Sequence, residues 1–376
     1  MTGPEKAFFT AYPELKFFKD KIFFVYASTH YDHSITRRDM REIVAEIRGA
    51  RKMGKNKIIF FNSSETYMPG FLHKAQCIAE LLHEIPKSDL FYTVGAVEGQ
   101  KFYDELCKKN NWENRFTVLS CHHFEYTIFS HASHNDSLDV PYEVRPKDKL
   151  FVCFNKLHRK HRLELLAEAI RNDWLKKSFY SFEGATKDWF NPNRRKVLPL
   201  SEQDLATIET IEDKLPLRLN ITHNRDNPVD VREEDLEYHQ NSYFSIITET
   251  VFEPYQPGEQ LMGYMDTLFL SEKIYKPFAF KHPFVAFAWH GAIKALRERG
   301  YKTFHPYIDE SYDDEIDPKK RFQMIIDEIK RLEKFTTEEW LEWQKNIKPI
   351  VEYNYKYLLS LTDHRVGLPV DHLFKD

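Results

Sequence analysis

The chain has 376 residues and a formal net charge of −4, from 54 Lys and Arg against 58 Asp and Glu. Its length exceeds that of a usual single domain, so we expect two domains of roughly 150 to 200 residues. A net acidic chain has no overall attraction for nucleic acid phosphates, although a local basic patch can still bind them. With only 12 Gly, the chain contains neither a GxGxxG nor a GxxxxGK[ST] phosphate-binding motif.

The four cysteines show no CxxC spacing and lie mostly among apolar neighbours, which predicts free thiols in a reducing compartment. The N-terminus lacks the basic and then apolar pattern of a signal peptide. No apolar run approaches the ~18 residues of a membrane span. We therefore expect a soluble protein of the cytoplasm.

The first 148 residues alternate short apolar runs with helical periodicity. The runs predict strands over 22–27, 57–62, 90–94 and 116–120. The periodic stretches predict helices over 36–51, 71–83 and 99–110. This alternation indicates a parallel sheet with helices on both faces.

A polar, Pro-containing segment over 129–149 predicts a domain boundary, after which the alternation restarts. We expect strands over 150–154, 179–182, 244–248 and 283–288, and helices ending near 175, 299, 334 and 359. The last helix contains Pro349 and is expected to kink there. Residues 184–240 predict loops with one or two helices, and 253–265 an irregular insertion.

Residues 269–313 contain the most informative polar pattern. Glu272 stands beside Lys273 and one helical turn before Lys276, at the start of a predicted helix in an apolar stretch. Such a helix start, next to strand ends, is a common place for a nucleotide's ribose and phosphates. The alternative is a solvated helix start whose carboxylate interacts favourably with the helix dipole.

Two further strand ends carry polar side chains. The loop 156–162, directly after the strand 150–154, has six cationic or potentially cationic residues in seven positions, and its Arg159 or Arg162 could bind phosphates bidentately. The alternative is a basic helix surface, to which we assign Lys160. Glu249 follows the strand 244–248 and either binds sugar hydroxyls or caps the next segment.

The segment Phe-Leu-Ser-Glu-Lys-Ile-Tyr over 269–275 resembles the donor-binding segment of the α1,3-fucosyltransferase family. The stretch 154–162, with 301–304 and 308–313, is similar to glycosyltransferases of phages and giant viruses. The resemblance covers roughly 150–345. With the two α/β halves, it implies a GT-B-like fold: two Rossmann-like domains, 1–148 and 149–345, facing a cleft, with C-terminal helices over 346–376 crossing back to the first.

The resemblance implies that Glu272 accepts hydrogen bonds from the donor's ribose hydroxyls and that Lys273 neutralises its diphosphate. The full donor-binding set that we predict lies on three strand ends and comprises Asn155, His158, Arg159, Arg162, Glu249, Glu272, Lys273 and Lys276. The co-substrate would be a nucleotide sugar, with GDP-sugar favoured and UDP-sugar possible, and no other cofactor. A viral chain would act in the host cytoplasm.

An inverting transferase needs a base in the first domain to take the proton of the acceptor hydroxyl. Asp32 is our first candidate and Glu65 the second, with His30 beside Asp32, because all follow predicted strands. The alternative is that these are ordinary solvated loop residues. A retaining enzyme would need no such base.

No metal site is expected, because the histidines at 122, 123, 131 and 134 lack a matching framework of Cys or carboxylate ligands. Asp313 and Asp314 lie in an acidic loop that we expect to be surface or hinge. The metal-independent habit of the GT-B architecture agrees with both expectations.

The sequence thus predicts a glycosyltransferase that moves a sugar to a hydroxyl of a glycan, a protein or a modified DNA base. A DNA acceptor would need a local basic face. The candidate face lies in 37–55 and consists of Arg37, Arg38, Arg41, Arg48, Arg51, Lys52 and Lys55. The alternative function is a non-catalytic cleft protein that binds a phosphorylated ligand or a glycan.

Overall fold

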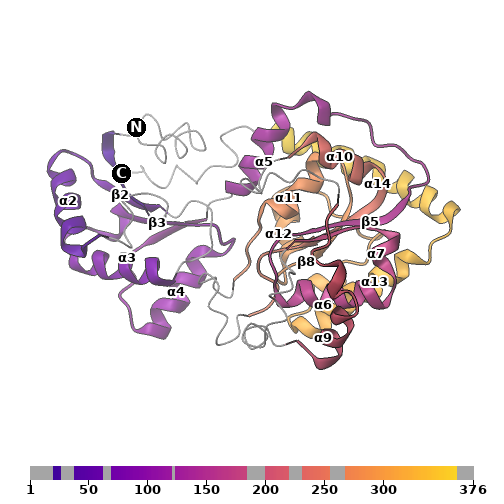
Figure 1. The fold of residues 1–376 in the computed structure, drawn as a ribbon. Coiled ribbons are helices and arrows are strands. Elements are labelled where there is room, and N and C mark those ends of the chain that lie inside the picture. The colour runs from indigo at the N-terminus through magenta and orange to yellow at the C-terminus, as the bar shows by residue number, and fades with distance from the viewer. Residues whose placement is uncertain are drawn as a thin grey trace. The chain divides into compact units, whose positions relative to one another are not determined.

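The computed structural model describes residues 20–26, 38–61, 69–120, 123–183, 200–219, 231–254 and 267–361. The chain divides into two compact units, Met1–Tyr126 with Leu261–Leu270 and Leu361–Asp376, and Thr127–Gln260 with Ser271–Ser360. Among the described residues, each unit contains a four-stranded parallel sheet (Figure 1). The predicted α/β class with two Rossmann-like domains is confirmed. The domain boundaries after 148 and 345, and the path of the C-terminal helices, stay predictions.

The sheet of the first unit runs in simple sequential order, β1-β2-β3-β4. Its strands are β1 (Ile22–Tyr26), β2 (Lys57–Phe61), β3 (Leu90–Val94) and β4 (Thr117–Ser120). The helices between them are α2 (Met40–Lys52), α3 (Pro69–Leu81) and α4 (Gly99–Asn110). Because parallel crossovers are right-handed, strands added in one direction place these helices on the same face.

The core of the first unit lies between this sheet and its helices. Phe60 and Tyr92, which alternate with residues of the other face, pack with Ile47 and Tyr103 of the helices in one buried cluster. Residues of the opposite face, such as Phe91, are also buried. A parallel sheet buried on both faces produces the continuous apolar runs from which the strands were predicted.

The second unit has the strand order β6-β5-β7-β8. The strands are β5 (Lys149–Asn155), β6 (Phe179–Phe182), β7 (Ser242–Thr248) and β8 (Phe284–Phe287). From β5 the chain passes through α6 (Lys160–Arg171) to β6 on one side. From β7 it passes through α11 (Glu272–Ala279) to β8 on the other side. The order therefore reverses between β5 and β7, which is where open α/β sheets bind ligands, at the carboxyl ends of the strands.

Helices cover both faces of this second sheet. In Figure 1, α10 (Glu233–Gln240), α11 and α14 (Thr337–Ser360) lie on one side, with α6, α9 (Glu202–Glu209) and α13 (Pro318–Glu333) on the other. The helix α12 (Ala292–Glu298) follows β8, and the short α7 (Trp174–Lys177) precedes β6. Among the described ranges, no helix is both long and apolar enough to cross a membrane.

Two local predictions differ from the structure. The helix α5 (His123–Ser133) was not predicted, because its aromatic and β-branched residues favour strands. The expectation that Asp313 lies at the surface is wrong, since the residue is 3% exposed, whereas its neighbour Asp314 is exposed. Its carboxylate accepts hydrogen bonds from the backbone N–H groups of Ile293 and Lys294, both at 2.9 Å. Asp313 thus caps α12, a partner that lies too far away in sequence for spacing to reveal.

Candidate functional site

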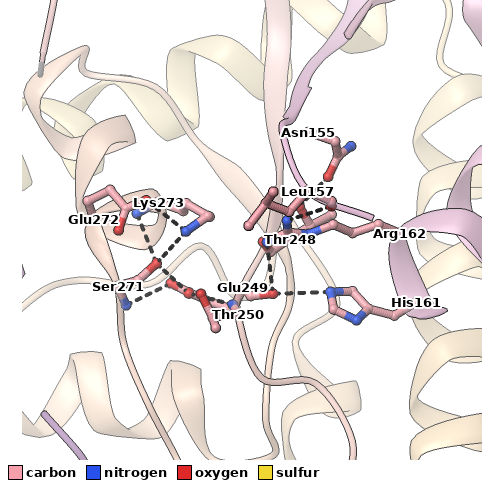
Figure 2. Close-up of polar contacts among 10 residues, drawn as sticks. All are labelled: Asn155, Leu157, His161, Arg162, Thr248, Glu249, Thr250, Ser271, Glu272 and Lys273. Atoms are coloured by element: carbon pink, nitrogen blue, oxygen red, sulfur yellow. Dashed lines mark hydrogen bonds and ion pairs between the residues drawn. The ribbon is translucent and has the colours of Figure 1, made fainter. Parts of the chain in front are cut away.

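Two helix starts meet the carboxyl end of β7 in the second unit (Figure 2). One is the start of α6, which follows β5, and the other is the start of α11, which precedes β8. The residue that both contact is Glu249, the first after β7. Three of the strand ends and helix starts singled out in the sequence are therefore brought to one edge of one sheet.

The carboxyl ends of β5 and β7 are joined by side chains. The Thr248 hydroxyl donates to Asn155 Oδ1 at 2.7 Å, and the amide nitrogen of Asn155 contacts Cys153 Sγ at 3.2 Å. Both Asn155 and Thr248 are buried. In this arrangement the Asn155 amide connects neighbouring strands, and its role in donor binding stays a prediction.

The first turn of α6 presents backbone N–H groups at this edge. Arg159 is the N-cap residue, with extended backbone angles (φ −141°, ψ 155°), and its side chain forms no capping hydrogen bond. The first N–H groups of a helix have no partner within the helix, and the helix dipole favours an anion there. This helix start is therefore suited to bind a phosphate or a carboxylate.

His161 and Arg162 anchor that helix start to the backbone that follows β7. His161 Nε2 donates to the Glu249 carbonyl at 3.1 Å, so the imidazole carries its hydrogen on Nε2. Arg162 donates from Nη1 to the Leu157 carbonyl at 3.0 Å, and from Nη2 to the carbonyls of Thr248 at 2.9 Å and Glu249 at 3.3 Å. The guanidinium of Arg162 therefore fixes the loop and the strand end.

Burial sets the ionisation of these two side chains. It lowers the pKa of Arg162 to about 10, an effect to which the charge of Arg159 adds and which Glu249 and Glu272 oppose. Burial, followed by the charge of Arg162, also holds the pKa of His161 well below its usual value. At neutral pH the site therefore contains a charged arginine and a neutral histidine.

The start of α11 is held by the carboxylate of Glu249, which is 0% exposed. Its Oε1 accepts from the backbone N–H of Ser271 at 3.0 Å, and its Oε2 accepts from the Ser271 hydroxyl at 2.6 Å. The backbone N–H of Thr250 also donates to Oε2, at 3.1 Å. Burial raises the pKa of Glu249, and the nearby Lys273 and the bonds from Ser271 only partly offset that effect.

Glu272 and Lys273 form an ion pair next to this anchor. Lys273 Nζ donates to Glu272 Oε1 at 2.7 Å and to the Ser271 hydroxyl at 3.1 Å. The side chain of Glu272 is 8% exposed and that of Lys273 is 28% exposed. Burial by itself would raise the pKa of Glu272, but the charges of Lys273 and Lys276 hold it below its usual value. Glu272 is therefore ionised at neutral pH, and Lys273 is the more accessible member of the pair.

The charges around this edge favour an anionic ligand. Arg162, Lys273 and Lys276 supply three positive charges against the two carboxylates of Glu249 and Glu272, so the cluster stays cationic even when both carboxylates are ionised. The partly exposed Lys273 side chain and the start of α6 can bind separate oxygens of one multivalent anion. A diphosphate has the charge and the number of acceptors that such a cluster can satisfy.

The other predicted residues are placed as follows. His158 and Arg159 are half-buried in the loop between β5 and α6. Lys160 Nζ binds both carboxylate oxygens of Glu253, at 3.0 and 2.8 Å, and its side chain is 15% exposed. The base candidates His30, Asp32 and Glu65 lie outside the described residues.

Two residues of the site were absent from the predicted set. Ser271 could have been found from its type and position, because serine directly before a helix is a preferred N-cap, and its hydroxyl accepts from the Lys273 N–H at 3.4 Å. His161 could not be singled out from the sequence, because it is one of six cationic or potentially cationic residues in 156–162. Over the ranges that the structure describes, no group of three or more His, Cys, Asp or Glu side chains could hold a metal ion.

Three of the six described cations of the basic face over 37–55 form ion pairs. Arg38 pairs with Glu46, Arg48 with Glu84 at 2.7 Å, and Arg51 with Asp89 at 3.0 Å. These pairs reduce the positive charge that the face offers to a polyanion.

No protein-family model matches this chain, and no curated protein matches it. Two solved structures resemble it distantly. One is a UDP-forming α,α-trehalose-phosphate synthase from Burkholderia xenovorans, with 12% identity and a TM-score of 0.45 over 96% of this chain and 77% of that one. The other is an α,α-trehalose 6-phosphate synthase from Burkholderia multivorans, with 11% identity and a TM-score of 0.38 over 94% and 72%. Likeness at this level does not extend to substrate or activity.

Proposed function

We propose that this protein is a glycosyltransferase that binds a nucleotide-diphosphate sugar at the carboxyl edge of the second sheet. The observation that carries the proposal is the meeting of two helix starts, α6 and α11, at the end of β7, with Lys273 between buried carboxylates and partly exposed. The resemblance of 269–275 to the α1,3-fucosyltransferase donor segment supports the same assignment.

The chemistry expected of this edge is stabilisation of the leaving group. When a sugar leaves its donor, negative charge grows on the departing diphosphate, and fixed cations and backbone N–H groups stabilise that charge. Lys273 and Arg159 would provide the cations and the uncapped start of α6 the N–H groups. Lys276 would add long-range electrostatic attraction for the diphosphate. Glu272 would accept hydrogen bonds from the ribose hydroxyls.

The catalytic base and the acceptor are proposed from the sequence alone. Asp32, Glu65 or His30 would take the proton of an acceptor hydroxyl in an inverting reaction. The proposed acceptors are a glycan, a protein or a modified DNA base. The donor nucleotide is proposed to be GDP, with UDP as the second choice, and no metal is invoked.

Nucleotide titration of a Lys273→Ala variant tests the donor site. We expect its affinity for GDP and UDP to fall about tenfold or more, since a hydrogen bond to a charged group contributes about 1.5–3 kcal/mol. Affinity for the nucleosides, which have no phosphate, should change little. Isothermal titration calorimetry measures all four ligands.

Lys294→Ala is the matched control, because Lys294 also lies in the first turn of a helix in this unit but has a side chain that is 69% exposed. It should bind GDP and UDP like the wild type. Unchanged affinity in Lys273→Ala would remove Lys273 from the site. Binding of a nucleotide sugar without slow donor hydrolysis or acceptor-dependent release of nucleotide would favour the alternative, a non-catalytic binding protein.

A further inference from the structure

Glu249 contacts both helix starts of the proposed donor site, through two different groups. Its backbone carbonyl accepts from His161 and Arg162 of α6, and its carboxylate accepts from Ser271 at the start of α11 (Figure 2). We propose that Glu249 is a positioning residue that orients Ser271 and, through it, the Lys273 ammonium for a diphosphate, without touching the ligand itself. This inference rests on the proposed function.

The carboxylate is already occupied by the protein. Oε1 accepts one hydrogen bond and Oε2 accepts two, and the residue is 0% exposed. The three donors are the N–H of the adjacent Thr250 and the N–H and hydroxyl of Ser271, which directly precedes α11. A ribose hydroxyl could reach these oxygens only if the start of α11 moved away. The geometry therefore favours a structural contact over a contact with sugar or ribose.

The carboxylate determines the direction of the Ser271 hydroxyl. A hydroxyl has one hydrogen and two lone pairs. Ser271 donates that hydrogen to Glu249 at 2.6 Å, which leaves its lone pairs for Lys273 Nζ at 3.1 Å and for the Lys273 N–H at 3.4 Å. The accepting oxygen of Glu249 behind the hydroxyl thus turns Ser271 into an acceptor for the ammonium. The ammonium is thereby held by two protein oxygens, Ser271 Oγ and Glu272 Oε1.

A glutamine at position 249 would break this relay while keeping nearly the same shape. Its amide has one acceptor oxygen in place of two, so an NH2 group would face either Ser271 or Thr250. An NH2 group that faces the Ser271 hydroxyl would donate to it and occupy a lone pair that Lys273 uses. The anchoring of α6 to the Glu249 carbonyl would remain, because it involves only the backbone.

The test compares ligands with and without a ribose. Glu249→Gln is titrated calorimetrically with inorganic pyrophosphate, with GDP and UDP, and with the corresponding nucleosides. A positioning role predicts that affinity for pyrophosphate and for the nucleoside diphosphates falls by the same factor, about five- to tenfold, as expected when a bond to a charged group is weakened. Affinity for the nucleosides should not change.

Two substitutions of Ser271 examine the relay independently. Ser271→Ala removes the hydroxyl and should weaken pyrophosphate binding as Glu249→Gln does. Ser271→Thr keeps both the hydroxyl and the N-cap preference, so it should retain most of the wild-type affinity. If Glu249→Gln fails to fold, the difference between these two variants decides. Glu253→Gln is the matched control, because Glu253 binds Lys160 and makes no contact with Ser271 in the described hydrogen bonds.

Four outcomes would overturn the inference. Weaker binding of GDP or UDP with unchanged binding of pyrophosphate would mean that Glu249 contacts the ribose or the base. Wild-type affinity for every ligand in Glu249→Gln, or equal affinity in Ser271→Ala and Ser271→Thr, would mean that the relay has no effect. A wild-type chain that binds neither pyrophosphate nor a nucleoside diphosphate would overturn the proposed function itself, and this inference with it.

Discussion

In the ranges that the structure describes, the two sheets have the same number of strands and all-parallel pairing, but they differ in strand order. The first runs β1-β2-β3-β4, so its described strands add in one direction. The second runs β6-β5-β7-β8 and reverses between β5 and β7. Reversal sends consecutive helices to opposite faces, which leaves a crevice at the carboxyl ends of the two central strands. The cluster around Glu249 lies at that reversal.

One buried arginine in each unit illustrates how the two sheets differ. Arg115 in the first unit donates from Nη2 to the carbonyls of Leu82 and Ile85, at 3.0 and 2.6 Å. Arg162 in the second unit also donates to backbone carbonyls, but these belong to the edge where the sheet reverses. The local chemistry is shared, and only the topology around Arg162 brings it next to helix starts that can bind an anion.

The largest expected effect is the loss of these arginines. Arg162→Met and Arg115→Met should each lower the free energy of unfolding by about 3 kcal/mol, because buried carbonyls lose their donors. Chemical denaturation followed by circular dichroism measures both. Only Arg162→Met should also weaken GDP and UDP binding, because it alone releases α6 from β7.

The claim that only Arg162 supports the nucleotide site would be contradicted if Arg115→Met weakened nucleotide binding as strongly as Arg162→Met. The claim would also be contradicted if Arg162→Met lost stability but kept wild-type affinity for GDP and UDP. Either result would show that nucleotide binding does not depend on the anchoring of α6 to β7.

The next effect is acid sensitivity, which should be concentrated in the second unit. Burial lowers the pKa of His239 from its usual 6.5 to about 4. Between these values the unfolded chain binds a proton that the folded chain does not, so stability falls as the pH is lowered from 6.5 to 4. The full difference of about 2.5 pKa units corresponds to a loss of about 3 kcal/mol that is complete only below pH 4, so the loss at mildly acidic pH is smaller. Denaturation of wild type and His239→Phe at several pH values measures this contribution.

His239→Phe should keep the stacking on Phe280, at a 4.1 Å centroid distance, and show a shallower loss of stability below pH 6.5. Its neighbour His282, also buried and with a strongly lowered pKa, will still titrate. His83→Gln in the first unit is the control, because that imidazole is exposed. An unchanged pH slope in His239→Phe would show that this imidazole does not contribute.

The smallest effect is expected from single hydroxyls at the two carboxyl edges. Thr248→Val removes the donor to Asn155 Oδ1, and Ser120→Ala removes the donor to the Val97 carbonyl at 3.1 Å. Each should cost about 1 kcal/mol of stability. Calorimetric titration should detect weaker nucleotide binding for Thr248→Val only. Equal nucleotide binding in both variants would argue that joining β5 to β7 does not matter for the site.

Much of the fold could be predicted because its signals are local. The strand Leu90–Val94 and the helix Gly99–Asn110 have the predicted bounds, since a buried parallel strand and an amphipathic helix leave direct patterns in sequence. The helix His123–Ser133 was missed because its residue types favour strands and only packing overrides that preference. The cap formed by Asp313 escaped prediction because it depends on two segments that meet only after folding.

The candidate site was predictable in its members but less so in their contacts. Glu249, Glu272 and Lys273 were placed at one sheet edge because parallel strands end together, and the structure brings them together there. Spacing could not show that the Glu249 carboxylate is used up by Ser271, or that Arg162 faces backbone carbonyls. Those contacts depend on how closely two helix starts approach one strand end.

Hydrogen exchange measured by mass spectrometry, with and without saturating GDP or UDP, tests the central claim most directly. The start of α6, where the N-cap side chain makes no capping hydrogen bond, should exchange quickly in the free protein, because the first N–H groups of a helix lack partners within it. Bound diphosphate should slow exchange in peptides that cover 158–163 and 270–275, while peptides at the ends of β3 and β4 should not change. Unchanged exchange at both helix starts with saturating nucleotide would contradict the proposed donor site.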